Sequence, residues 1–402
     1  MANRILKVCI AVMAVLLVLL LGAVVILESG WILPMEPVMH PTELPTDPPT
    51  APPTEPSTVP PTDPPTEPPT ESPTEPPTEP PTEPPTEPPT EPPTEPQPER
   101  FLLTFAGDCT LGSKPEMFGA ANHFVDTIGT DYSYPFRKVL EYFANDEFTM
   151  VNLESVLADD GTHADKEYYF RGPTAYSQIL TGSSVQAVTL ANNHTYDFGY
   201  EGYRTTTRTL DQAGVVWADV YEPRLYTTEH GLVIGLVAGN YYFDQTHFTN
   251  QIHRLREQGA QIIVCNFHWG NELERYPTED QIRVGHWAID AGADIVIGHH
   301  PHVLQPVEIY NGGIICYSLG NFCFGGNVNP TDKDSAIVQF EVFRQPDGVV
   351  TLGGMTVIPV SISGLTDWNN FQPTPMDPES QAYLRVLGKL GLEEPVIQLE
   401  SP

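Results

Sequence analysis

Cysteine is scarce in this sequence of 402 residues and never occurs in closely spaced pairs. Only five cysteines are present, and the absence of CxxC pairs argues against a zinc finger. Cys9 lies in an apolar run, which leaves Cys109, Cys265, Cys316 and Cys323 for the globular region. Cys316 with Cys323 is one conceivable disulfide, but a core of this size needs no cross-link, so we expect free, buried thiols.

Basic residues are also few, since 19 Lys and Arg stand against 52 Asp and Glu, for a net charge of −33. This balance excludes nucleic acid as a general partner, because that binding depends on basic side chains. An acidic surface is also a poor passive binder of polyanions. An anionic substrate would therefore need help from metal ions or from local Arg and Lys side chains.

One long apolar run is present, from Val8 to Leu27, without a charged residue. It is long enough to span a bilayer as a helix. Arg4 and Lys7 precede the run and Glu28 follows it, so the positive-inside rule places residues 1–7 in the cytoplasm. We expect residues 8–28 to be an uncleaved signal anchor, which gives a single-pass protein of the cell membrane with an extracellular globular domain. A cleaved signal peptide is the alternative.

Residues 29–99 are dominated by proline, threonine and glutamate, and their later part repeats Thr-Glu-Pro-Pro. Proline removes amide donors, and the segment has few apolar side chains to bury. We expect a disordered stalk of polyproline-II character that acts as a spacer.

From residue 101 the pattern changes to strands that alternate with helices, which predicts an α/β fold with a largely parallel sheet. Strands are expected at 101–106, 148–153, 185–190, 215–218, 232–238, 261–267 and 294–297, and helices at 134–143, 174–180, 200–213, 249–258 and 278–291. A hairpin at 305–319 and strands at 335–343 and 349–360 suggest a second sheet. We place the globular domain at 100–365 and a helical extension, with a helix near 380–390, at 366–402.

Polar side chains recur where these strands end, including three histidines just after residue 298. The ends of parallel strands lie on one edge of a sheet, so residues distant in sequence converge there. The candidate metal ligands are Asp108, Glu154, Asn193, His268, His300 and His302. Oxygen and imidazole donors suit a divalent ion such as manganese, iron or zinc. Each residue alone also has a structural interpretation, such as a cap or a solvated loop.

Five further residues are candidates for catalysis or substrate binding. His194 is a candidate proton donor, and Asp197 either orients its imidazole or caps the next helix. Glu272 faces either the site or solvent. Arg171 is either an anion clamp or half of a surface salt bridge. Asn321 is a candidate substrate-binding residue.

In combination and in order, these motifs resemble those of the capsule synthesis protein CapA family, also called the poly-γ-glutamate capsule family, which is related to the calcineurin-like metallophosphoesterases. The motifs are Phe105-Ala-Gly-Asp108, Asn152-Leu-Glu154, Ala191-Asn-Asn-His194, His268-Trp-Gly270, Gly298-His-His-Pro-His302 and Tyr317-Ser-Leu-Gly-Asn-Phe322. The resemblance implies a four-layer α/β/β/α sandwich with metal at the strand ends. It also implies that Asn193, His268, His300 and His302 are ligands and that His194 is catalytic.

Two motifs depart from the phosphoesterase pattern. Asp108 is followed by Cys109 and Thr110 where the superfamily has Asp-x-His, and Asn152-Leu-Glu154 replaces the usual Gly-Asp. Glu154 is therefore the expected bridging carboxylate, and the number of ions, one or two, is open.

The resemblance predicts a role in synthesis or export of a capsule polymer, with metal-dependent hydrolase or transferase chemistry on an anionic polymer or phosphoester. Components of a capsule-polymer synthase are the expected partners. An extracellular metallophosphoesterase unrelated to capsule, or a non-catalytic accessory subunit of an envelope complex, are the alternatives.

Overall fold

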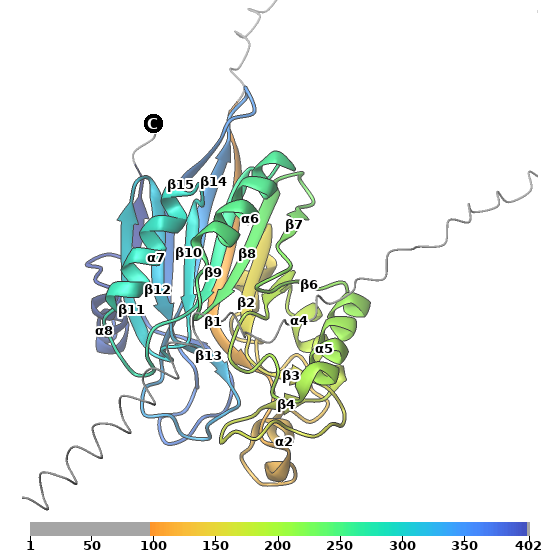
Figure 1. Cartoon of the computed structure of the whole chain (residues 1–402). Helices are drawn as coiled ribbons and strands as arrows, with labels where there is room; N and C mark the ends of the chain where they lie inside the picture. The colour runs from red at the N-terminus through yellow and green to blue at the C-terminus, as the bar shows by residue number, and fades with distance from the viewer. Residues whose placement is uncertain (1–96, 400–402) are drawn as a thin grey trace, which may run out of the picture. The chain divides into compact units, whose positions relative to one another are not determined.

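The computed structural model describes residues 97–399, whose core consists of two β-sheets that face each other (Figure 1). Within that range the larger sheet has nine strands, in the order β16-β15-β14-β1-β2-β5-β6, with β13 paired to β1 and β17 to β15. Their bounds are β1 (Glu99–Thr110), β2 (Phe148–Leu153), β5 (Ala187–Thr189), β6 (Val216–Ala218), β13 (Asn321–Phe324), β14 (Asp334–Arg344), β15 (Val350–Ser361), β16 (Thr374–Pro375) and β17 (Val396–Gln398). Strands β1, β2, β5 and β6 are parallel, whereas β14 and β15 continue the sheet in antiparallel fashion.

The smaller sheet has the order β11-β12-β10-β9-β8-β7 in the described part of the chain. Its strands are β7 (Arg224–Thr227), β8 (Val233–Asn240), β9 (Ile262–His268), β10 (Ile295–His299), β11 (Leu304–Tyr310) and β12 (Gly313–Leu319). A short separate pair joins β3 (Val156–Leu157) to β4 (Arg171–Gly172). Strands β9 and β10 are buried along their whole length, as expected for parallel strands with both faces covered.

Helices cover the outer face of each sheet. As Figure 1 shows, α6 (Gln245–Glu257) and α7 (Glu279–Asp290) lie over the smaller sheet, where Phe248, Ile252 and Val284 pack on its strands. The outer face of the larger sheet is covered by four short elements and one long helix: α2 (Phe124–Ile128), α3 (Leu140–Ala144), η2 (Thr174–Tyr176), α4 (Ser177–Thr181) and α5 (Gly199–Ala213). A further short element, η1 (Pro115–Met117), buries no residue. The resulting order of helix, sheet, sheet and helix confirms the predicted α/β class.

The alternation of side chains along β1 separates two hydrophobic cores. Phe105 points between the sheets and packs in one cluster with Leu236 and Ile297, while the next residue, Ala106, belongs to the cluster on the opposite face. This period of two is what a strand buried on both faces produces. The four cysteines of the described region are buried and unpaired, as the sequence predicts.

Two helix boundaries follow the expected local signals. Gly214 ends α5 with φ 72°, a left-handed conformation in which glycine carries no Cβ penalty. Thr278 caps α7, and Gln281 completes a capping box with it.

Several predicted boundaries were wrong. Strand β1 continues to Thr110, so Asp108 lies inside this strand rather than after it. The helix expected at 134–143 is only α3, which begins at Leu140, and residues 134–139 form turns. The strands β14 and β15 extend the first sheet, and the second sheet is instead built from β7 to β12.

The C-terminal segment is part of the same compact unit as the rest of the described chain. Helix α8 (Gln381–Lys389) buries Val386 and Leu387 in the core between the sheets, with Leu390 beside them. Ser380 caps this helix by accepting a hydrogen bond from the Tyr383 amide.

The signal anchor predicted at residues 8–28 and nearly all of the stalk predicted at 29–99 lie outside the described residues. Between residues 97 and 399, no helix combines the length and apolarity needed to cross a membrane.

Candidate metal centre

The metal-ligand candidates come together from both sheets. Asp108 lies near the end of β1, Glu154 directly follows β2, and Asn193 follows β5 in the larger sheet. His268 ends β9, and His300 and His302 follow β10 in the smaller sheet. The ends of parallel strands in two facing sheets thus bring these side chains to one place.

Two ligand sets share the carboxylate of Glu154. One set is Asp108, Glu154 and His302, and the other is Glu154, His268 and His300, with the ligand atoms of each set within 4.8 Å of one another. The Oε1 atom of Glu154 lies 3.6 Å from His268 Nε2 and 3.9 Å from His302 Nε2. A shared carboxylate between two sets is the arrangement that a bridged pair of ions requires.

The surroundings of Glu154 fit a bound cation. This side chain is fully buried, and neither carboxylate oxygen has a hydrogen-bond partner among the described residues. Burial, together with the nearby Asp108 carboxylate, raises the pKa of Glu154 well above its ordinary value. A buried carboxylate without partners is unfavourable, and coordination to a divalent ion would remove that penalty.

Asp108 is held by neighbours on three sides. Asn152 Nδ2 donates to Oδ1 at 2.9 Å, and His302 Nδ1 lies 3.2 Å from Oδ2. His299 Nδ1 lies 3.2 Å from Oδ1 but lacks hydrogen-bond geometry. Burial opposes the charge, but the two histidines outweigh it and hold the pKa of Asp108 well below its ordinary value.

His302 has its ring fixed by Asn321, whose Oδ1 lies 3.0 Å from Nδ1. Burial alone would lower the pKa of His302, but the Glu154 and Asp108 carboxylates outweigh burial and raise it to about 9. In the metal-free protein this imidazole therefore carries a proton near neutral pH, which a metal ion must displace.

The second set has different neighbours. The amide oxygen of Asn193 lies 3.0 Å from His268 Nε2, and the Tyr241 hydroxyl lies 2.6 Å from His300 Nε2. Burial lowers the pKa of His268 well below its usual range and that of His300 to about 4. Both imidazoles are therefore neutral near pH 7, the form that binds metal.

The backbone after β10 is unusual at both ligand histidines. His300 has φ 96° and His302 has φ 57°, which lie in the left-handed region that most residues avoid. Gly298 precedes them in close contact with β12, since a Cβ there would lie 1.9 Å from the Tyr317 carbonyl oxygen. This tight contact and the turned backbone aim the two imidazoles at Asp108 and Glu154.

His194 and Asp197 form a dyad beside the ligand sets. His194 Nδ1 lies 2.7 Å from Asp197 Oδ2, and the buried Asp197 also accepts from the Phe170 amide at 2.6 Å. Lys166, in the loop between β3 and β4, donates to Asp197 Oδ1 at 2.6 Å and to the Asn193 carbonyl at 3.0 Å. Burial lowers the pKa of His194, and Asp197 acts in the opposite direction.

A cavity of about 530 Å³ opens over this cluster and is called here the metal-site cavity. His194, His302 and Asn321 form its floor, and Lys166, Glu272 and Phe324 are among the side chains around it. The exposed Glu272 forms a third candidate ligand set with His300 and His302, so its carboxylate reaches the centre from the cavity side.

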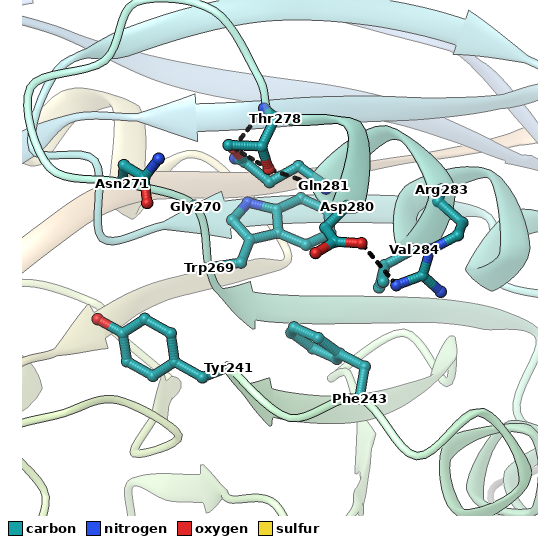
Figure 2. Close-up of a pocket in the computed structure, with 10 residues that line it drawn as sticks. All are labelled: Tyr241, Phe243, Trp269, Gly270, Asn271, Thr278, Asp280, Gln281, Arg283 and Val284. Atoms are coloured by element: carbon teal, nitrogen blue, oxygen red, sulfur yellow. Dashed lines mark hydrogen bonds and ion pairs between the residues drawn. The ribbon is translucent and has the colours of Figure 1, made fainter. Parts of the chain in front are cut away.

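A separate hollow of about 350 Å³ is lined in part by Tyr241. Figure 2 draws the residues around it. The rings of Tyr241 and Phe243 lie opposite the buried indole of Trp269, and an ion pair between Asp280 and Arg283 stands at one side. Tyr241 thus contacts the candidate ligand His300 through its hydroxyl and also lines this hollow.

The structure brings most of the sequence-predicted residues together. Asp108, Glu154, Asn193, His268, His300, His302, His194, Asp197, Glu272 and Asn321 all lie at or beside the two ligand sets. Arg171 is the exception. Its guanidinium lies over the rings of Phe118 and Phe198, at 5.8 and 5.2 Å, and it does not line the metal-site cavity.

Three contacting residues were missed by the sequence analysis. Tyr241 directly follows β8, so its place at a strand end was an available signal. Asn152 lies in a motif that was recognised, but only the fold shows its amide on Asp108. Lys166 comes from an irregular loop that carries no pattern, and nothing local marks it.

Comparison with known proteins agrees with the family that the sequence motifs resemble. The family model "Bacterial capsule synthesis protein PGA_cap" matches residues 102–224 and 221–326. The chain is 30% identical over 293 residues to a capsule biosynthesis protein CapA of Bacillus anthracis, covering 66% of this chain and 68% of that protein. It is 31% identical over 238 residues to the PGA biosynthesis protein CapA of Bacillus subtilis, covering 53% and 62% respectively, so less than two thirds of that relative is spanned.

Among solved structures, the calcineurin-like phosphoesterase YfkN from Bacillus subtilis aligns with 73% of this chain and 97% of its own, at 12% identity and a TM-score of 0.42. A TM-score this low carries no argument about the present chain. The family assignment rests instead on the sequence match, which covers more than half of the chain and includes every candidate ligand. The chain belongs to the bacterial capsule synthesis protein PGA_cap family.

Proposed function

We propose that this protein acts in the synthesis or export of a poly-γ-glutamate capsule and carries a metal-dependent hydrolase or transferase site. The observation that carries the chemical part is the buried Glu154, shared by two ligand sets and without a hydrogen bond to either oxygen among the described residues. The polymer part is supported by the family and by the names of the relatives, which concern capsule and PGA biosynthesis.

Two divalent ions would be held by this chain. Asp108, Glu154 and His302 would hold one, and Glu154, Asn193, His268 and His300 the other. Nitrogen and oxygen donors without thiolate suit manganese, iron or zinc. Such ions would supply polarisation of the scissile group and activation of water near neutral pH.

The proton transfer is assigned to His194. Because its Nδ1 faces the Asp197 carboxylate, the Nδ1–H donates there and Nε2 is left to exchange a proton with the substrate. Lys166 and the Phe170 amide keep Asp197 in place, which fixes the ring. His194 lines the metal-site cavity, so a leaving group bound there lies within reach of its imidazole.

A second candidate function is an extracellular metallophosphoesterase unrelated to capsule. The types of donor atom favour this function. An asparagine, histidines and carboxylates form the two candidate ligand sets, and His194, the proposed proton donor, lies beside them. Ions clamped in this way serve phosphoester hydrolysis as well as amide chemistry.

Turnover by the purified full-length chain distinguishes these functions. The substrates are poly-γ-glutamate, followed by chain length and new amine ends, and a generic phosphodiester, each with and without manganese. We expect manganese-dependent turnover of the polymer that is lost in His194→Ala, although this variant keeps its bound metal. Turnover of the phosphodiester alone would support the second function. Metal binding without any turnover would overturn the enzymatic proposal and leave an accessory role.

We further propose that residues 8–28 anchor the chain in the cell membrane, with the globular domain extracellular and next to components of the polymer synthase. The charge-free apolar run after Arg4 and Lys7 supports this orientation. Protease added to intact protoplasts should remove the globular domain, and washing with alkaline carbonate should leave the chain in the membrane. Release by carbonate would contradict anchoring.

A further inference from the structure

A second, larger hollow adjoins the metal-site cavity. It measures about 700 Å³ and shares two lining residues, Thr331 and Asp332, with that cavity. The loop after β9 also lines both, since Glu272 and Leu273 face the metal-site cavity and Arg275 faces the hollow. The two spaces are therefore neighbours along one surface, and helix α8 forms the far wall through Arg385 and Lys389.

The charge of this hollow is opposite to that of the chain as a whole. Four cationic side chains line it, against two carboxylates, in a protein with a net charge of −33. The cations are Arg275, Lys333, Arg385 and Lys389, and the carboxylates are Asp332 and Asp334.

Two of the cations are already neutralised. Lys389 Nζ lies 2.7 Å from both Asp332 and Asp334, and its side chain is only 8% exposed. Arg385 binds both oxygens of Asp334 at 2.7 Å, a bidentate arrangement. These contacts fix α8 to the first residue of β14, Asp334, and to Asp332 in the loop before it.

The positive charge of the other two cations is not neutralised by a close carboxylate. Arg275 lies 3.5 Å from Asp332, whose carboxylate is already bound at 2.7 Å by Lys389, and its side chain is 57% exposed. Within the described part of the chain, Lys333 donates only to neutral oxygens, those of Asn329, Pro330 and Thr366. Two positive charges without a committed carboxylate thus remain in a hollow beside the candidate metal centre.

We propose that this hollow is a subsite for an anionic polymer, in which Arg275 hydrogen-bonds a carboxylate of the polymer and the nearby charge of Lys333, whose three N–H groups are already used, attracts the polymer through space, while the reacting segment occupies the metal-site cavity. The proposal rests on the proposed function, because it takes the ligand to be a polymer with one carboxylate per residue. An acidic protein can bind an acidic polymer through this subsite, because positive charge is concentrated in the hollow although the protein as a whole is negative.

Binding of a fluorescent oligomer of γ-linked glutamate to the full-length chain tests the subsite. We expect the double variant Arg275→Gln/Lys333→Gln to bind more than about tenfold more weakly, because it loses the charge-assisted hydrogen bond of Arg275 and the nearby positive charge of Lys333. Added salt should weaken binding to the wild type more than to the variant. The control is Arg208→Gln/Arg254→Gln, which removes the same charge from exposed positions on α5 and α6 and should leave binding unchanged.

Lys333 also tethers its own loop, so a second variant guards against misfolding. Arg275→Glu changes only an exposed side chain and should weaken binding by more than tenfold without shifting the thermal unfolding midpoint. Equal binding by this variant and by the wild type would overturn the subsite.

These experiments distinguish failure of the subsite proposal from failure of the proposed metal chemistry. The His300→Ala/His302→Ala variant should lose metal and turnover but still bind the oligomer, with the same dependence on Arg275. Polymer turnover that is unaffected by Arg275→Glu and Arg275→Gln/Lys333→Gln would overturn the subsite and leave the proposed function standing. Oligomer binding that depends on Arg275, in a protein without turnover, would support the subsite while overturning the enzymatic proposal.

Discussion

The carboxylate of Glu154 is buried next to a second carboxylate, with no hydrogen bond to either of its oxygens among the described residues. In the metal-free protein, burial and the nearby Asp108 carboxylate make the ionised form of Glu154 unfavourable, whereas a bound cation would make that form a favourable partner. We therefore expect manganese to stabilise the wild type, by about 2.7 kcal/mol at a hundred times its Kd.

Replacement of Glu154 by glutamine should separate these two effects. Glu154→Gln should leave the metal-free protein equally or more stable, because it removes a buried ionisable group that has no partner, and should abolish the stabilisation by manganese. Thermal unfolding with and without the ion measures both. Glu274→Gln, an exposed change on the loop after β9, is the matched control and should respond to manganese like the wild type. A normal response of Glu154→Gln would contradict the bridging role.

His302 gives metal binding a defined pH dependence. Its pKa of about 9 in the metal-free protein means that the imidazole is protonated below that pH, and the metal must displace this proton. Apparent affinity should therefore rise about tenfold per pH unit as pH approaches 9, and level off above it. Titration calorimetry in two buffers of different ionisation enthalpy also reports the released proton. An affinity that is constant between pH 6 and 9 would argue against His302 as a ligand.

At the residue scale, the convergence of the candidate ligands was predictable because Asp, Glu, Asn and His occur at or just after the ends of apolar strands. What the sequence hid are contacts made across the fold. Asn152 supports Asp108 from a neighbouring strand, and Lys166 reaches Asp197 from an irregular loop. Arg171 was a candidate anion clamp, but its guanidinium lies over aromatic rings instead. A single arginine near a motif does not indicate in which direction its side chain points.

At the scale of elements, α8 is a part of the core rather than an appendage. Leu387 is 2% exposed and packs between the sheets, whereas Leu384, one turn earlier, is 52% exposed. Leu387→Ala should cost about 2–5 kcal/mol in the free energy of unfolding. The same change at Leu384 should stay within about 0.5 kcal/mol. Urea unfolding of both variants measures the difference, and equal costs would show that α8 does not contribute to the core.

Element types were more predictable than their ends or their partners. Parallel strands such as β9 and β10 are marked by apolar runs, and α5 and α7 by amphipathic patterns with clear caps. The extent of β1 was missed because its pairing with β13 and β14, which decides where it stops, is long-range. The same reason explains why β14 and β15 could not be assigned to the first sheet from sequence: strand order depends on packing across the whole domain.

At the scale of the whole molecule, the two sheets meet with their strand ends in one region, and each contributes half of the candidate ligands. Asp108, Glu154 and Asn193 come from the larger sheet, and His268, His300 and His302 from the smaller one. A bound metal centre would therefore also join the two sheets, so that its formation depends on the complete domain.

The most direct test of this account is the metal content of the purified full-length chain after loading with manganese, zinc or iron, beside the His300→Ala/His302→Ala variant. The account predicts about two ions per chain in the wild type, one for each ligand set that shares Glu154, and loss of both in the folded variant. A folded wild type that binds no metal under any of these conditions would contradict the metal centre and, with it, the proposed chemistry.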